Sequence, residues 1–290
     1  MQTRKPVVAG QFYPSQHDTC LDEINDCLKQ RTLKETLPET IVAGIVPHAG
    51  WTFSGSLAAL VFSAIKQQHE KVDTFVIFGA AHSYLGLVPV VYDKGSWDTP
   101  LGEVFIDEDL AETVLKKGKA KSDSDQHCYE HSIEVQLPFI RHLFPDAGIL
   151  PVLVPPSPGA ISLGRELGEI ISPSEKKIVC IGSTDLTHYG SHYGFEPMGP
   201  GKQGFKWASE VNDKEFIDAA LKLDAETMLK TSEENHNACG AGAAAAAVAT
   251  AEKLGKTQGI LLAHTNSNEI MLNKMGTSSS DSVGYAAIVF

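Results

Sequence analysis

The sequence predicts an α/β protein with a central, largely parallel sheet that is covered by helices on both faces. Apolar runs of strand length begin near residues 41, 74, 149 and 178, and segments of helical periodicity lie between them. Glycine and proline are spread along the whole chain, and no linker-like change in composition interrupts it. We therefore expect one domain spanning residues 1–290.

Charge and cysteine content exclude several classes of protein. The 290-residue chain has a formal net charge of −12, so nucleic-acid binding is not expected. No apolar run is long enough to span a bilayer, and residues 1–14 lack the apolar core of a signal peptide, which predicts a cytoplasmic location. The 5 cysteines are odd in number and irregularly spaced, so free thiols are expected instead of a disulfide framework.

The amino-terminal part is expected to contain an extended arm and one helix. Residues 1–14 end in the turn-like QFYP, and residues 15–31 carry an apolar stripe at helical spacing. Cys20 and Cys27 belong to that stripe. We interpret both as small buried hydrophobic residues of the helix's inner face.

The stretch IVAGIVPHAGWTFSG, residues 41–55, holds the first candidate site residue. An apolar run suited to a buried strand stops at Pro47, and His48 follows in a glycine-flanked turn before a helix. His48 is thus expected at the carboxyl end of a strand, the edge where open α/β sheets place their ligands. Histidine is the commonest metal ligand, but a turn histidine bonded only to backbone is the alternative.

The second apolar run, in VDTFVIFGAAHSYLG, repeats this arrangement and ends at His82. Residues 87–104 are expected to form a strand pair or a long loop, with Trp97 near a wall of the site. Residues 107–117 have helical periodicity and are predicted to lie on the surface.

Residues 125–145 are expected to contain a helix that begins near Glu130 and has His131 in its first turn. No strand end presents the neighbouring residues His127, Cys128 and His142. For these three a capping or surface role is favoured over ligation.

A further strand (148–155) and helix (161–171) lead to KKIVCIGSTDLTHYG, whose strand ends in Ser183, Thr184, Asp185 and His188. Cys180 lies within that strand and is expected in the core. Residues 209–223 and 225–229 are predicted to be helical.

Cys239 directly precedes an alanine-rich helix, and strands are expected over 259–265 and 283–290. A thiol at a helix amino terminus is biased toward thiolate by the helix dipole and free N–H groups, which predicts reactivity or metal binding. The alternative is that Gly240 and Gly242 only let the helix pack closely on the sheet. His264, at the end of a strand, is a weaker candidate.

The sequence gives no support for the familiar nucleotide and hydrolase sites: no GxGxxG follows the first strand, and neither GxxxxGK[ST] nor GxSxG occurs. The candidates that remain are His48, His82, Asp185, His188 and Cys239. Two imidazoles with one anionic ligand are typical of non-haem iron, and a thiolate also suits copper or zinc. His188 could then serve as acid or base over the metal.

Several blocks occur in order along nearly the whole chain, namely VAGQFYP, PHAGWTFSG, FGAAHS, EHSIEVQLPF, STDLTHYG and NACGAGA. Taken together they resemble the Memo family, which is found in eukaryotes, bacteria and archaea. The family's fold is similar to that of class III extradiol dioxygenases. Those enzymes cleave catechol-type rings with non-haem iron(II) held by two histidines and a glutamate.

The resemblance implies roles for individual residues. His48 and His82 would occupy the two histidine ligand positions and Cys239 the carboxylate position, with iron(II) expected and copper or zinc as alternatives. His188 would be the acid/base histidine, with Asp185 close by. From its place three residues earlier in the same turn, we expect Asp185 to orient the imidazole of His188. The departure from the dioxygenase pattern is Cys239, because a thiolate replaces the carboxylate.

The resemblance also implies a second class of function. The human family member mediates receptor-tyrosine-kinase-driven cell motility, binds a phosphotyrosine peptide in the corresponding pocket, and has been linked to iron- or copper-dependent redox chemistry. The hypotheses are therefore a metal-dependent oxidoreductase and a non-catalytic module that binds a phosphotyrosine-type peptide or another small ligand in the same cleft. Three ligand-type residues and an acid/base candidate are more than a peptide groove needs, which favours the first.

Overall fold

The computed structural model describes residues 2–290, and a nine-stranded sheet forms its centre. The sheet has the order β10-β12-β2-β9-β3-β8-β4-β7, and β11 also pairs with β12. Strands β2, β9, β3 and β8 run parallel, whereas β12 and β4 join them antiparallel. The strands are β2 (Ala43–Val46), β3 (Thr74–Gly79), β4 (Val90–Val91), β7 (Lys121–Ser122), β8 (Gly148–Leu153), β9 (Ile178–Ser183), β10 (His188–Tyr189), β11 (Ile260–Asn266) and β12 (Ser282–Val289).

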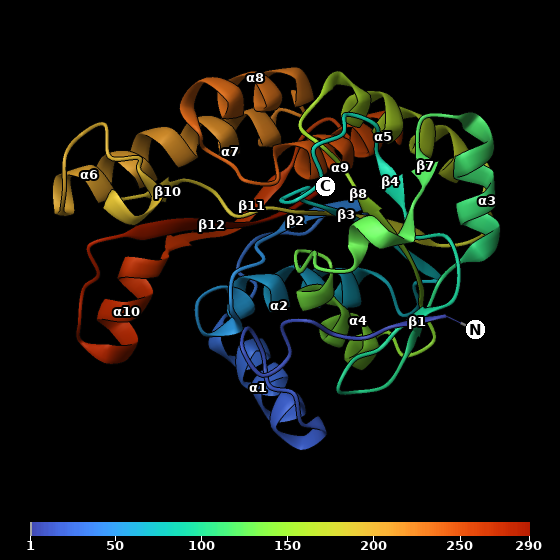
Figure 1. The fold of residues 1–290 in the computed structure, drawn as a ribbon, viewed down its shortest axis with the longest axis horizontal. Helices are drawn as coiled ribbons and strands as arrows, with labels where there is room; N and C mark the ends of the chain where they lie inside the picture. Colours follow the sequence, from blue (N-terminus) through green and yellow to red (C-terminus); the bar gives the residue numbers. More distant parts are fainter. Residues whose placement is uncertain (1) are drawn as a thin grey trace.

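Helices cover both faces of this sheet, which confirms the α/β architecture expected from the sequence. Figure 1 shows α1, α2 and α4 on one side and α5, α7, α8 and α9 on the other. The helices are α1 (His17–Gln30), α2 (Trp51–Gln68), α3 (Glu108–Lys117), α4 (Leu137–Leu143), α5 (Pro158–Ile171), α6 (Lys202–Trp207), α7 (Lys214–Leu221), α8 (Ala225–Asn235), α9 (Ala241–Lys253) and α10 (Ser267–Met275). A π-helical turn, Ala208–Asp213, connects α6 to α7.

The two faces bury alternate residues of each central strand. In β3, Phe75 and Ile77 pack among α1, α2 and α4, whereas Val76 and Phe78 pack among α5, α7 and α9. Because successive side chains of a strand point to opposite faces, continuous apolar runs are what a sheet covered on both sides requires. Cys20, Cys27 and Cys180 are buried in these two cores, as expected.

Small residues let the alanine-rich helix α9 approach the rest of the core closely. A Cβ added at Gly182 of β9 would lie 2.8 Å from the carbonyl oxygen of Ala243, and one at Gly164 of α5 would lie 2.3 Å from that of Ala246. The expected close packing of α9 on the sheet is therefore confirmed.

A small second sheet holds the amino-terminal arm, with the order β1 (Thr3–Arg4), β5 (Ser96–Trp97) and β6 (Val104–Phe105). The guanidinium of Arg4 lies 4.0 Å above the Trp97 ring and donates to the carboxylate of Glu134 at 2.7 Å. Trp97 is fully buried beneath Arg4 and does not line the cavity described below, so its expected place in a wall of the site is wrong.

The chain between residues 124 and 143 also differs from expectation. The helix expected to begin near Glu130 begins at Leu137, after 3-10 turns at Ser124–His127 and Glu134–Gln136. His127 is buried, and its Nε2 lies 3.1 Å from the carbonyl oxygen of Val90, so a capping or surface role is wrong. Cys128 is exposed, as expected. In the described range 2–290, no helix combines the length and hydropathy needed to cross a membrane.

Candidate metal centre

The candidate residues meet at the carboxyl edge of the parallel strands. His48 follows β2, His82 follows β3, and Asp185 and His188 follow β9. Because β2, β9 and β3 are adjacent and parallel, they end at the same edge of the sheet. Cys239 reaches this edge from the segment that precedes α9 and is held by its own N–H, which donates to the carbonyl oxygen of Asp185 at 3.2 Å.

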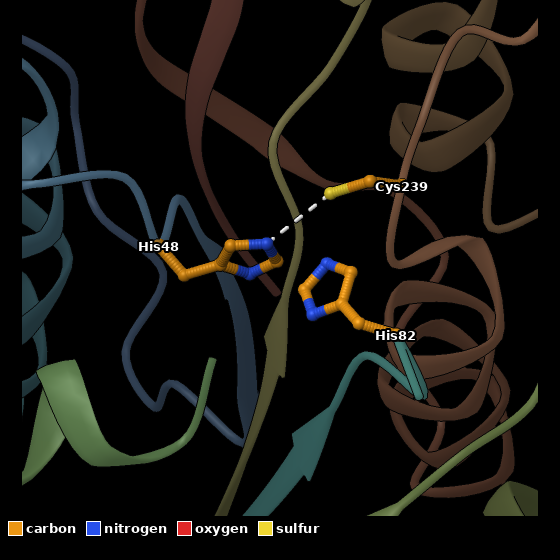
Figure 2. Close-up of side chains that lie close together, drawn as sticks. All are labelled: His48, His82 and Cys239. Carbon is orange, nitrogen blue, oxygen red and sulfur yellow. Dashed lines mark hydrogen bonds between the residues drawn. The ribbon is translucent and has the colours of Figure 1, made fainter. Parts of the chain in front are cut away.

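The three predicted ligands form a compact group. One ligand atom from each of His48, His82 and Cys239 lies within 4.8 Å of the other two. Sγ of Cys239 is 3.2 Å from Nε2 of His48. Figure 2 shows the two imidazole rings and the sulfur facing a common space. Their assignment as metal ligands stays a prediction.

Hydrogen bonds set the tautomer of His48. The hydroxyl of Ser183 donates its single proton to the carbonyl oxygen of Ser132 at 2.8 Å, so it can only accept from Nδ1 of His48 at 3.1 Å. Nε2 of His48 therefore carries a lone pair and faces Cys239. Burial and the neighbouring His82 and His131 lower the pKa of His48 well below its usual value, which keeps the ring in the neutral form that binds metals.

His82 is oriented by a carboxylate that the sequence did not reveal as part of the site. Its Nδ1 lies 3.0 Å and 3.1 Å from the two carboxylate oxygens of Glu130. Burial raises the pKa of Glu130, but the hydrogen bond and charge of His82 outweigh it and hold that pKa at about 2. The ionised carboxylate accepts a hydrogen bond from Nδ1–H of His82 and so orients the ring. Burial lowers the pKa of His82, but the hydrogen bond and charge of Glu130 outweigh it and raise that pKa, so an ion at Nε2 would have to displace a proton there.

Burial changes the chemistry expected of Cys239. Removal from solvent, followed by the charge of Asp185, raises the pKa of this thiol far above its usual value. The expected bias toward thiolate from the amino terminus of α9 is therefore wrong for the metal-free protein, because desolvation outweighs the helix dipole. An ion at this position would have to displace the thiol proton.

Asp185 and His188 occupy the same edge, and ligand atoms of Asp185, His188 and Cys239 also lie within 4.8 Å of one another. The carboxylate of Asp185 accepts a hydrogen bond from the backbone N–H of His48 at 2.7 Å and thereby positions the His48 turn. In residues 2–290 it forms no hydrogen bond to the ring of His188, so the expected orienting role toward that ring is not seen. Nε2 of His188 is buried without a hydrogen-bond partner in the described chain. An orphaned imidazole nitrogen of this kind is free to act on a bound molecule.

His131 is the second site residue that the sequence did not assign. Its ring stacks on that of His82, with centroids 5.0 Å apart and an angle of 4°, and lies edge-on to His48 at 5.5 Å. The sequence did not assign Glu130 and His131 to the site because a regular helix was expected to begin at Glu130. The chain instead makes irregular turns here, and these turns point both residues into the site. The only signal was their place in the block EHSIEVQLPF. His264 does not join the group; its Nε2 lies 2.9 Å from the carboxylate of Asp213.

A cavity of about 400 Å³ opens above this group. Its lining joins the histidines and Asp185 to residues of the amino-terminal arm, α2, α10 and β12. The lining residues are Phe12, His48, Ala49, Gly50, Phe53, His82, His131, Asp185, His188, Tyr193, Ser267, Met271, Ser279, Asp281, Val283 and Tyr285.

The side chains fit a transition-metal ion. His48 presents an oriented Nε2 lone pair, and the hydrogen bond from Nδ1 of His82 to Glu130 fixes the orientation of the second imidazole. Cys239 supplies sulfur beside them. Two imidazole nitrogens and one sulfur suit iron, copper or zinc, whereas magnesium and calcium prefer oxygen.

Comparison with known proteins supports the resemblance noted in the sequence. Residues 4–289 match the family described as Memo-like protein. A MEMO1 family protein of Thermococcus onnurineus is 36% identical over 295 residues, which covers 99% of this chain and 99% of the relative. A MEMO1 family protein of Methanosarcina mazei is 34% identical over 293 residues, covering 100% of this chain and 99% of that protein.

A solved structure supports the fold independently. The crystal structure of an uncharacterized protein from Escherichia coli K12 superposes with a TM-score of 0.52 at 13% identity, covering 84% of this chain and 99% of the other. At this identity the likeness concerns the fold alone. The family match and the relatives at full length together show that this chain belongs to the Memo family.

Proposed function

We propose that the protein is a metal-dependent redox protein whose non-haem ion is held by His48, His82 and Cys239. The observation that carries the proposal is the convergence of these three side chains within 4.8 Å at the carboxyl edge of the sheet. Iron(II) is the proposed ion, and copper and zinc are the alternatives that the same donors accept. When bound, such an ion supplies Lewis acidity and, for iron or copper, electron transfer.

The chain's own residues divide the remaining work. Ser183 and Glu130 hold the imidazoles of His48 and His82 through Nδ1, so that Nε2 of each would be the ligand atom. His188 has a buried, unpartnered Nε2, and we assign it the transfer of protons to or from a bound substrate. Asp185 and Cys239 complete the proposed catalytic group, Asp185 by fixing the His48 turn.

Metal analysis of untagged protein, purified without chelator under anaerobic conditions, tests the proposal. Iron, or copper or zinc, is expected near one ion per chain. Apoprotein should then bind iron(II) with a matching stoichiometry in a competition titration. Protein that is purified without metal and does not take up any of these three ions would overturn the proposal. The single-domain organisation and the cytoplasmic location stay predictions.

A further inference from the structure

The cavity above the candidate metal centre has a strongly aromatic wall. Phe12, Phe53, Tyr193 and Tyr285 line it together with the thioether of Met271. Aromatic faces and thioethers make favourable contacts with planar rings. With a volume of about 400 Å³, the cavity is the size of a site for one small ring-bearing molecule.

Besides Asp185, which positions the His48 turn, a second acidic residue, Asp281, lines the cavity. β12 pairs antiparallel with β10, so that Val283 is opposite His188 and Ser282 is opposite Tyr189. Asp281 therefore lies beside Gly190, two residues after His188, and is one of the residues that line the cavity. A Cβ added at Gly190 would be 2.3 Å from Oδ1 of Asp281, which shows how closely the two segments approach.

The carboxylate of Asp281 is held in place but not saturated. Oδ2 accepts from the hydroxyl of Ser280 at 2.6 Å, and Oδ1 accepts from the backbone N–H of His192 at 3.0 Å. These two hydrogen bonds lower the pKa of Asp281, so the group is ionised at neutral pH. A carboxylate offers about four lone-pair positions, so it retains capacity for a further donor.

No lysine or arginine of the chain balances this charge inside the cavity, and the histidines that line it belong to the candidate metal centre. Among the described residues that line it, none is lysine or arginine. Arg31 and Lys274 line a neighbouring cavity; there Nε of Arg31 donates to Ser56 and Nζ of Lys274 donates to the carbonyl oxygen of Thr52. Proteins recognise phosphate and carboxylate groups mainly through such cations, so the free end of a ligand here is not expected to be anionic.

We propose that this cavity binds a small aromatic molecule that carries a protonated amine, with the ring between the aromatic side chains and the ammonium at Asp281. The end of the ring opposite the ammonium would face the metal centre, and this part of the proposal rests on the proposed function. A phosphate-bearing aromatic ligand would meet no lysine or arginine in this cavity, and its only basic partners would be the histidines of the metal centre. It should bind more weakly than the amine.

The test uses metal-free protein, because a bound ion would itself attract anions. Calorimetric titrations compare four probes: tyramine, the uncharged 4-ethylphenol, the anionic phenyl phosphate, and propylamine, which has no ring. Tyramine should bind about 2- to 10-fold more tightly than 4-ethylphenol, the range for one partly exposed charged hydrogen bond. Phenyl phosphate and propylamine should bind more weakly than either.

Asp281→Asn keeps the shape and the acceptor for the N–H of His192 but removes the charge. It should reduce the preference for tyramine over 4-ethylphenol to about 1-fold, because an uncharged amide does not distinguish them by charge. Glu175→Gln is the matched control. Glu175 is an exposed acid before β9, at the end of that strand opposite the site, and its loss should leave the preference unchanged.

Equal binding of tyramine and 4-ethylphenol to the wild type, or a preference that survives Asp281→Asn, would overturn the assignment of Asp281. Tighter binding of phenyl phosphate would identify an anion-binding module instead. If propylamine binds as tightly as tyramine, the aromatic ring does not contribute to binding and the proposal is wrong. If tyramine does not bind at about 10 mM, the cavity is not a site for such ligands. Metal content is measured separately, so loss of metal binding with unchanged tyramine preference overturns only the proposed function.

Discussion

Asp213 joins His264 to the turn that carries His188. Its carboxylate lies 2.9 Å from Nε2 of His264 and accepts from the backbone N–H of Thr187 at 2.9 Å. Asn212, its neighbour in the π-helical turn, donates to the hydroxyl of Thr187 at 3.0 Å. π-helical turns recur at functional sites. Here the turn brings the side chains of Asn212 and Asp213 into contact with Thr187, the residue before His188.

We expect Asp213→Ala to lower the free energy of unfolding by about 3–5 kcal/mol, because it leaves the N–H of Thr187 and the His264 ring without their buried partner. Asp213→Asn keeps an acceptor for Thr187 and should cost less. Chemical denaturation of both variants measures the difference. Equal and small losses for the two variants would show that the carboxylate does not hold this turn.

Cys239→Ser should lower metal affinity at least about tenfold, because a serine hydroxyl stays protonated and offers no anionic donor. Cys20→Ser and Cys27→Ser are the controls, since both thiols are buried in the core contacts of α1, where burial raises their pKa to about 12. Those variants should keep wild-type affinity in a chelator competition titration. Unchanged affinity in Cys239→Ser would show that the sulfur is not a ligand.

Glu130→Gln should lower metal affinity by about 10- to 100-fold, the usual effect of removing the carboxylate behind a ligating histidine. Glu130 accepts from the N–H of His82 and the N–H of Ser132 on separate oxygens, and the amide keeps an acceptor for one of the two, so the turn loses one of these hydrogen bonds and not both. The same competition titration measures the change, with Glu175→Gln as the control. An affinity equal to that of the wild type would mean that Glu130 does not tune His82.

His188→Ala should keep its metal and lose any metal-dependent redox activity by about 10²- to 10⁴-fold, the usual contribution of a general acid or base. Metal content and oxygen consumption are measured on the same preparation. His192→Ala, an exposed histidine four residues further along, is the control and should keep both. Loss of metal on mutating His188 would identify it as a ligand.

His127 predicts a pH dependence of stability. Burial lowers its pKa to about 3, whereas in the unfolded chain a histidine titrates near its usual value of 6.5. As the pH falls, the unfolded state therefore takes up a proton before the folded state does. Above pH 6.5 His127 is neutral in both states and the free energy of unfolding is unaffected, whereas between pH 6.5 and pH 3 the free energy of unfolding decreases as the pH falls. His127→Gln removes the titration and should lessen the loss of unfolding free energy between pH 7 and pH 4 by about 3 kcal/mol.

Urea denaturation of the wild type and His127→Gln at both pH values measures this difference. The amide of glutamine can still donate to the carbonyl oxygen of Val90, as Nε2 of His127 is placed to do. Parallel loss of stability in the two proteins would show that another group controls the acid transition.

The pattern of apolar residues in the sequence was sufficient to predict the central sheet and the histidines at the carboxyl ends of its strands. Short uninterrupted apolar runs favour strands buried on both faces, and parallel strands end at one edge, so the sequence predicts that His48, His82 and His188 lie together. The same logic predicted that Cys180 is core. These features depend on local composition and on the geometry of parallel sheets.

Tertiary structure alone decided the state and the surroundings of those residues. Glu130 and His131 enter the site through irregular turns that have no periodic signal, and the His48 tautomer depends on a proton that Ser183 donates to Ser132. The dipole argument for a Cys239 thiolate was wrong because desolvation depends on what surrounds the sulfur from every side. Burial and hydrogen-bond partners arise from residues distant in sequence, so only the packed chain determines them.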